Sequence, residues 1–109
     1  MKFFIIKYLS KLYILHNLYF KHKYYLKRKS YSDSGEDLYI LSNFDKKGFY
    51  VDVGCHHPTR LNNCHLLYLN GWSGINIDPS EISIKLFDFA RKKDTNICSA
   101  VSLKKGLIY

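Results

Sequence analysis

Long hydrophobic runs are missing from this chain of 109 residues. The longest apolar stretches near its start, Phe3 to Ile6 and Leu12 to Leu15, hold four residues each. A membrane-spanning helix needs about 20. Lysines interrupt the N-terminal segment, and no small-x-small cleavage site follows it. These absences argue against a transmembrane helix and against a cleaved signal peptide.

Cysteine is also scarce. The three cysteines, Cys55, Cys64 and Cys98, are an odd number and lack the spacing of a disulfide framework. Small secreted domains that depend on disulfides usually carry an even set at regular spacing. The cysteine content therefore predicts reduced thiols in a cytoplasmic protein.

Acidic residues are absent from the first 32 positions, which carry eight lysines and arginines. The rest of the chain carries nine basic and nine acidic residues, so the net charge of +8 lies entirely in the N-terminal segment. A basic pI that arises from one terminal segment does not indicate a nucleic-acid partner for the remainder. We therefore expect no nucleic-acid binding.

Residues 1–30 are predicted to form a basic amphipathic helical segment. A helical wheel places polar residues on one face (Lys7, Ser10, Lys11, Asn17, Lys21 and Arg28) and apolar residues on the other (Ile5, Tyr8, Leu9, Leu12, Leu15, Tyr19 and Phe20). Such a helix either lies on an anionic membrane surface or packs on a domain with its lysines in water. The first alternative predicts peripheral contact at the inner face of a membrane through residues 1–28.

Residues 31–109 alternate between helical and strand patterns. Apolar and β-branched runs predict strands, and capping residues mark helix starts, with Ser34 and Ser80 as the expected N-terminal caps. The expected elements are a helix over 36–44, a strand over 49–53, a helix over 62–70, a strand over 74–78, a helix over 81–93 and a strand over 95–101. This order predicts an α/β fold, a Rossmann-like half-sheet of about three parallel strands.

Acidic residues and a glycine stand at the ends of the first two expected strands. Gly54 follows the first strand, Asp52 lies just before its end, and Asp78 ends the second strand. Two such strands about 25 residues apart are typical of nucleoside-cofactor binding. Asp78 could accept hydrogen bonds from ribose hydroxyls or could simply form an Asp-Pro turn. Asp52 could meet a cationic or amino group of a ligand or cap the nearby loop.

Histidines and cysteines cluster after the first strand, but their spacing does not predict a metal site. The types are suitable for zinc, yet no C-x-x-C pair occurs among Cys55, His56, His57, Cys64 and His65. We expect His56 and His57 to face a cofactor or substrate cleft. The basic run from Arg91 to Lys93 is expected to be a solvated helix end.

Several motifs in order resemble the FkbM-type S-adenosylmethionine-dependent methyltransferases. The matching segments, spread over about residues 31–109, are SGEDL at 34–38, GFYVDVGCHHP at 48–58, LY at 67–68, GWSGINIDP at 71–79 and AVS at 100–102. The resemblance implies a Rossmann-like methyltransferase domain over 31–109. Its activity would be O-methylation of a hydroxyl on a saccharide or another small-molecule acceptor.

The resemblance also implies a binding site for S-adenosyl-L-methionine. It would place the methionine part of the cofactor near Asp52, Gly54 and His56, its ribose on Asp78, and its adenine near the segment 100–102, where Ser102 is the polar residue. The pattern departs from the family at His56 and Pro58, which replace alternating glycines. It also departs at residues 62–64, where Asn-Asn-Cys replaces Ser-Asn-Thr.

The length predicts an incomplete domain. A doubly wound sheet with its helices usually needs clearly more than 109 residues, so we expect the fourth and later strands to be absent. The leading interpretation is a truncated methyltransferase that is inactive alone. The alternatives are a cofactor-binding remnant without enzymatic activity and a membrane-surface protein that uses its basic helix.

Overall fold

The computed structural model describes residues 2–103 and contains helices and strands in the predicted order. The N-terminal segment forms α1 (Lys2–Leu15), the π-helical turn η1 (His16–Phe20) and the 3-10 turn η2 (Lys23–Tyr25). The remaining elements are α2 (Glu36–Asn43), β1 (Phe49–Val53), α3 (His65–Leu69), β2 (Ser73–Asp78), α4 (Glu81–Ala90) and β3 (Thr95–Cys98).

The three strands form one parallel sheet in the order β1-β2-β3. Val51 pairs with Ile75, which pairs with Thr95. Two residues further along, Val53 pairs with Ile77, which pairs with Ile97. The predicted α/β class and the three-stranded parallel half-sheet are therefore confirmed. Both α4 and β3 end three residues earlier than predicted, at Ala90 instead of Lys93 and at Cys98 instead of Val101.

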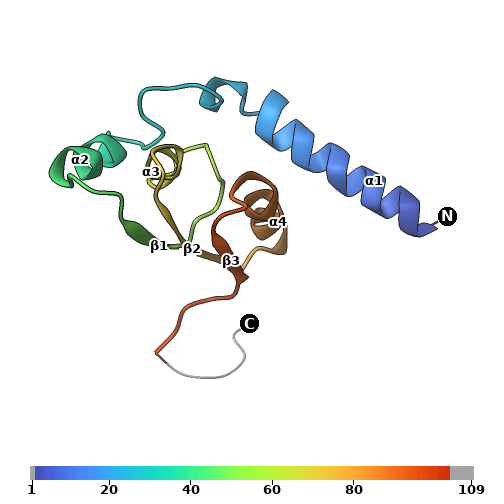
Figure 1. Cartoon of the computed structure of the whole chain (residues 1–109). Helices are drawn as coiled ribbons and strands as arrows, with labels where there is room; N and C mark the ends of the chain where they lie inside the picture. Colours follow the sequence, from blue (N-terminus) through green and yellow to red (C-terminus); the bar gives the residue numbers. More distant parts are fainter. Residues whose placement is uncertain (1, 104–109) are drawn as a thin grey trace.

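Helices α2, α3 and α4 all lie on one side of the sheet (Figure 1). On that side, Tyr50 of β1 packs with Cys64, Leu67 and Trp72, which are buried around α3. A second buried cluster joins Cys55 in the loop after β1 to Ile84 and Phe87 of α4. The hydrophobic core thus occupies a single layer between the sheet and its helices.

No described helix covers the opposite face of the sheet (Figure 1), and this face carries apolar side chains. Phe49, Val51 and Val53 of β1 are 63%, 57% and 59% exposed. Because side chains alternate along a strand, these three share one face, together with Ile75 and Ile77 of β2. Purely parallel sheets are ordinarily covered on both faces. We call this uncovered surface the bare face.

The start of α2 differs from the prediction. Ser34 does not cap the helix; Gly35, at a left-handed φ of 80°, precedes it. The buried Asp37 organises this region, because its carboxylate accepts hydrogen bonds from Ser30 Oγ (2.6 Å) and Tyr31 N (2.7 Å). Burial raises the pKa of Asp37, but these hydrogen bonds outweigh burial and hold it below its usual value. At α4, by contrast, Ser80 Oγ accepts from Ser83 N as predicted.

The N-terminal segment is not one regular amphipathic helix. At η1 the backbone N–H of Lys21 donates to His16 O at 2.8 Å, a five-residue span that widens the turn. Beyond this point Asn17 and Leu18 are buried. The assignment of Asn17 to a solvent-facing polar side is therefore wrong.

Helix α1 itself stays largely in solvent and projects from the body of the molecule (Figure 1). Its large apolar residues Ile5, Tyr8, Leu9 and Leu12 are all exposed. Within residues 2–103, no helix is both long enough and apolar enough to cross a membrane. One of the two alternatives from the sequence was that this helix packs its apolar side on the domain. Along most of its length α1 does not pack in this way.

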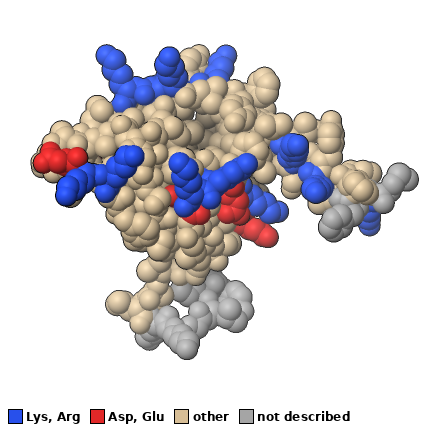
Figure 2. All heavy atoms as spheres, in the orientation of Figure 1, with Lys and Arg blue, Asp and Glu red and all other residues tan. Residues whose placement is uncertain are grey.

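Basic residues dominate the surface of the N-terminal segment. Figure 2 shows lysines and arginines along α1 and over the stretch that follows it, with no acidic residue among them. Acidic side chains appear only on the parts of the surface formed by later residues. The charge asymmetry of the sequence is thus also a spatial asymmetry: three of the eight basic residues lie on α1, which projects from the body, and five lie on the stretch that follows it.

Candidate functional site

The loop after β1 begins at a glycine that its backbone conformation requires. Gly54 has a φ of +73°, a value that L-residues with a side chain rarely adopt. The backbone N–H groups of Gly54 and Cys55 both donate to Ile77 O, at 2.8 and 3.1 Å, which ties the loop to the end of β2. A Cβ at Gly54 would meet nothing within 4 Å. Open space therefore borders the main chain at this strand end.

Asp78 ends β2 directly beside this loop. Its buried carboxylate accepts one backbone N–H on each oxygen, from Ser80 at 2.8 Å and from His56 at 3.1 Å. Asp78 therefore fixes the start of α4 and the loop after β1 at the same time. A carboxylate has about four acceptor positions, so each oxygen retains capacity for one further donor.

Asp52 is half-buried and turned toward the helices, on the same side of β1 as Tyr50. Its Oδ2 atom accepts from Asn62 Nδ2 at 3.3 Å. Burial raises the pKa of Asp52 above its usual range, and the positive charge of Arg91 opposes part of that increase. The Asp52 side chain thus supports the loop after β1 from the helix side of the sheet.

The five candidate site residues are only partly brought together. Gly54, His56 and Asp78 meet at the ends of β1 and β2, and Asp52 lies beneath them. His56 has a φ of 57°; its side chain is exposed and its backbone N–H donates to Asp78. Ser102 lies in the exposed irregular segment after β3, which runs away from the helices in Figure 1.

His57 faces the N-terminal segment instead of the strand ends. Its Nδ1 accepts from the backbone N–H of Thr59 (3.1 Å) and Arg60 (3.0 Å), so the ring proton is on Nε2, 3.3 Å from Asn17 O. Burial, and then the neighbouring His22, lowers the pKa of His57 to about 4. His57 is therefore a neutral tie between the loop and η1.

The histidines and cysteines at residues 55–65 do not form a metal site. Within the described range, no group of three or more His, Cys, Asp or Glu residues is placed to hold an ion. Burial, and then the charge of Asp52, raises the pKa of both Cys55 and Cys64 to about 12. Zinc binds thiolates, so two thiols that stay protonated are poor ligands.

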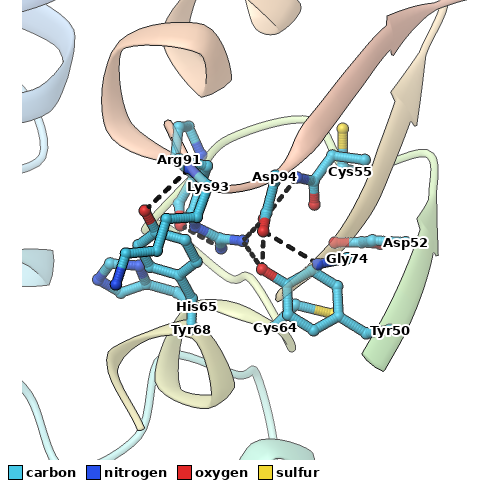
Figure 3. Close-up of polar contacts among 12 residues, drawn as sticks. Tyr50, Asp52, Cys55, Cys64, His65, Tyr68, Gly74, Arg91, Lys93 and Asp94 are labelled. Carbon is cyan, nitrogen blue, oxygen red and sulfur yellow. Dashed lines mark hydrogen bonds and ion pairs between the residues drawn. The ribbon is translucent and has the colours of Figure 1, made fainter. Parts of the chain in front are cut away.

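A buried arginine joins the site to the core (Figure 3). Arg91, at the end of α4, has no exposed surface and forms an ion pair with Asp94 at 3.2 Å. Its guanidinium also donates to Tyr50 Oη at 3.0 Å and to the carbonyl oxygen of Pro58 at 2.9 Å. The prediction of a solvated helix end is wrong for Arg91, although Lys92 and Lys93 are exposed as expected.

Asp94 completes this cluster from the turn before β3 (Figure 3). Its carboxylate accepts from the Tyr50 hydroxyl in a short hydrogen bond, from Gly74 N at 3.0 Å and from Asn76 Nδ2 at 2.9 Å. Desolvation, and then the hydrogen bond to Asp94, raises the pKa of Tyr50, so the hydroxyl stays protonated and donates. One carboxylate therefore joins β1 and β2 to the end of α4.

Asn62 connects the arginine cluster to the loop at the strand ends. Its Oδ1 accepts from Arg91 Nη2 at 2.9 Å and from the N–H groups of Cys64 and His65 at the start of α3. Its Nδ2 donates to His57 O at 2.9 Å and to Asp52. Sequence reasoning placed Asn62 inside a helix over 62–70, but α3 begins at His65 and Asn62 precedes it as a buried hub.

The sequence contained one weak signal for this network. Arg91 and Asp94 stand three residues apart at a helix end, an arrangement compatible with an ion pair. Nothing in the sequence places Tyr50 or Asn62 beside them. No protein-family model matches the chain, and neither a curated protein nor a solved structure shows significant similarity to it.

Loss of the buried guanidinium should destabilise the fold severely. We expect Arg91→Met to lower the free energy of unfolding by about 3–5 kcal/mol, because it leaves the carboxylate of Asp94 buried without its charge partner. Urea denaturation followed by circular dichroism measures this change. Lys92→Met, at the exposed neighbour, should stay within about 0.5 kcal/mol of the parent chain.

The double variant Arg91→Met/Asp94→Asn distinguishes a buried charge from lost packing. It removes both charges, so it should recover part of the stability that Arg91→Met loses. An Arg91→Met chain that unfolds at the same urea concentration as the parent would contradict the role given to this ion pair.

Two buried histidines should make the fold sensitive to mild acid. Burial lowers the pKa of His57 to about 4 and that of His65 to about 3, whereas an unfolded histidine titrates near 6.5. Below pH 6.5 the unfolded state binds more protons, so stability falls as pH decreases toward 4. The expected slope is about 1.4 kcal/mol per pH unit for each histidine.

Urea denaturation at pH 7, 6 and 5 measures this slope. His65→Gln should reduce it, because one of the two groups no longer titrates. The exposed His16 provides the matched control, and His16→Gln should leave the slope unchanged. Equal stability of the parent chain at all three pH values would show that the histidines are not held neutral.

Proposed function

We propose that the chain is part of an FkbM-type methyltransferase domain that binds S-adenosylmethionine at the carboxyl ends of β1 and β2. One observation carries the proposal: the loop at Gly54 and the buried carboxylate of Asp78 are joined by the hydrogen bond from His56 N. Ligands of open parallel sheets bind at the carboxyl ends of strands. The motifs that resemble the family occur on these same two strands.

The residues present fit the cofactor at three points. The space beside Gly54 allows a ligand to approach the main chain. Asp78 has acceptor capacity left for hydroxyl groups of a ribose, and the carboxylate of Asp52 lies near enough to the loop to favour a positively charged group. When bound, S-adenosylmethionine would supply an electrophilic methyl group on a sulfonium.

We further propose that the chain alone transfers little or no methyl group to a saccharide or other small-molecule hydroxyl. Methyl transfer depends on close, in-line positioning of the acceptor against the methyl group. The described residues place all helices on one side of the sheet and leave the bare face open. A cofactor-binding half that needs a covering partner to act accounts for this arrangement.

The cofactor proposal is tested by calorimetry with the whole chain. S-adenosylmethionine should bind, and Asp78→Asn should weaken binding at least about tenfold, because it removes a charged acceptor from the ribose position. Asp45→Asn, at an exposed acid of the turn before β1, should bind like the parent chain.

Thermal unfolding of each variant separates lost binding from lost folding, since Asp78 also holds two backbone N–H groups. Should Asp78→Asn fail to fold, Asp52→Asn provides the second test. No heat of binding by the folded parent chain would refute the cofactor proposal. Transfer of labelled methyl by the isolated chain would refute only the proposal that it is inactive alone.

The second candidate function is attachment to an anionic membrane surface from the cytoplasmic side. The specific observation is the exposure of Phe4, Ile5 and Tyr8 on α1, together with Lys7 and Lys11 on the same projecting helix. Apolar side chains beside lysines, without any acid, are the composition of interfacial helices. This attachment is compatible with cofactor binding because the two use different surfaces.

Vesicle flotation of the whole chain tests this attachment. Vesicles that contain phosphatidylserine should retain the protein, and Ile5→Ser combined with Tyr8→Ser should abolish retention by removing apolar contact. Leu38→Ser, at an exposed leucine of α2, is the matched control. Equal retention of parent and Ile5/Tyr8 variants would exclude α1 as the membrane contact.

A further inference from the structure

A cationic cavity of about 340 Å³ lies where the N-terminal segment meets the loop after β1 and the start of α4. Lys21 and His22 line it from one side, and His56, His57 and Arg60 line it from the other. No Asp or Glu is part of its lining. In the described part of the chain, neither Lys21 nor Arg60 forms an ion pair with a carboxylate.

The wall of the cavity is held by a specific contact. The neutral ring of His57 joins Asn17 O at 3.3 Å and lies edge-on to His22 at 4.8 Å between ring centres. Burial, followed by the positive charges of Arg60 and Lys21, lowers the pKa of His22. Positive groups therefore converge on a space where their repulsion is not offset by a protein carboxylate.

An apolar groove of about 330 Å³ continues from this cavity between α1 and α4. Tyr13 and Ile82 line both spaces, so the two are adjacent. Ile6, Leu9 and Ile14 complete the apolar wall of the groove on α1.

We propose that the cavity and the groove together bind one phosphate-bearing amphiphile. The phosphate would lie between Lys21 and Arg60, which donate charge-assisted hydrogen bonds to phosphate oxygens. The hydrocarbon chain would lie along the groove, where burial of its methylene groups favours binding. The charge of the cavity requires an anion, and its continuity with an apolar groove selects an anion that carries a chain. The site does not depend on the cofactor proposal.

Calorimetry at low salt with monomeric octyl phosphate tests this site on the whole chain. Octyl phosphate should bind at least about tenfold more tightly than inorganic phosphate, which lacks the chain, and than octyl glucoside, which lacks the charge. Arg60→Gln with Lys21→Gln should remove this advantage over octyl glucoside. Lys46→Gln, at an exposed lysine outside the cavity, should change nothing.

The groove is tested separately with a variant in solvent-exposed α1. Leu9→Ser should weaken octyl phosphate binding and leave inorganic phosphate binding unchanged, whereas Leu12→Ser, on the same helix outside the groove, should have no effect. Equal affinity for octyl phosphate and inorganic phosphate would overturn the proposal, as would equal weakening by Lys46→Gln.

Vesicles that contain phosphatidic acid identify the source of the ligand. In a chain that already carries Ile5→Ser and Tyr8→Ser, which remove the α1 contact, retention that Arg60→Gln with Lys21→Gln abolishes would indicate a bilayer lipid as the natural ligand. Binding of monomeric octyl phosphate without such retention would indicate a soluble phosphate ester. Octyl phosphate binding that neither Arg60→Gln with Lys21→Gln nor Leu9→Ser weakens would overturn the site.

Discussion

A guanidinium group stays protonated in a protein, so the burial of Arg91 forces the surrounding chain to supply acceptors. Asp94 supplies the opposing charge, and Tyr50, Pro58 and Asn62 supply oxygen atoms. These partners come from β1, from the loop after it and from the turn before β3. The relative placement of these three segments thus follows from the need of one buried cation for hydrogen-bond acceptors.

The candidate site depends on the same requirement. The side-chain oxygen of Asn62 accepts a hydrogen bond from Arg91, and its amide nitrogen donates to Asp52 and to the loop that begins at Gly54. The loop in turn bonds the end of β2 at Ile77 and Asp78. Hydrogen bonds therefore connect the buried core to the strand ends in one continuous polar network. A change in the core would therefore be transmitted to the backbone groups of the candidate site at the strand ends.

The sequence predicted those features that arise from local patterns. β-Branched runs located β1, β2 and β3, and a serine before an acidic first turn located α4, because strand and cap preferences act over a few residues. The prediction failed where the environment of a side chain depends on other parts of the fold. Arg91 was taken for a solvated end and Asn17 for a surface residue, because Tyr50 and His57 meet them only after folding. Ser34 was taken for a cap, but Gly35 precedes the helix, and Asp37 accepts hydrogen bonds from Ser30 and Tyr31 instead.

The π-helical turn at His16–Phe20 sets the rotational phase of the chain before it. A regular α-helix advances about 100° per residue, so one added residue in a turn rotates everything upstream by about that angle. Leu9, Tyr13 and Asn17 stand four residues apart and therefore share the side of the segment that meets α4 and the loop after β1, whereas the residues after the wide turn are displaced from this repeat. The wide turn therefore ends the α-helical repeat of the N-terminal segment, so the four-residue spacing that places one side of α1 toward the body does not extend to the residues that follow.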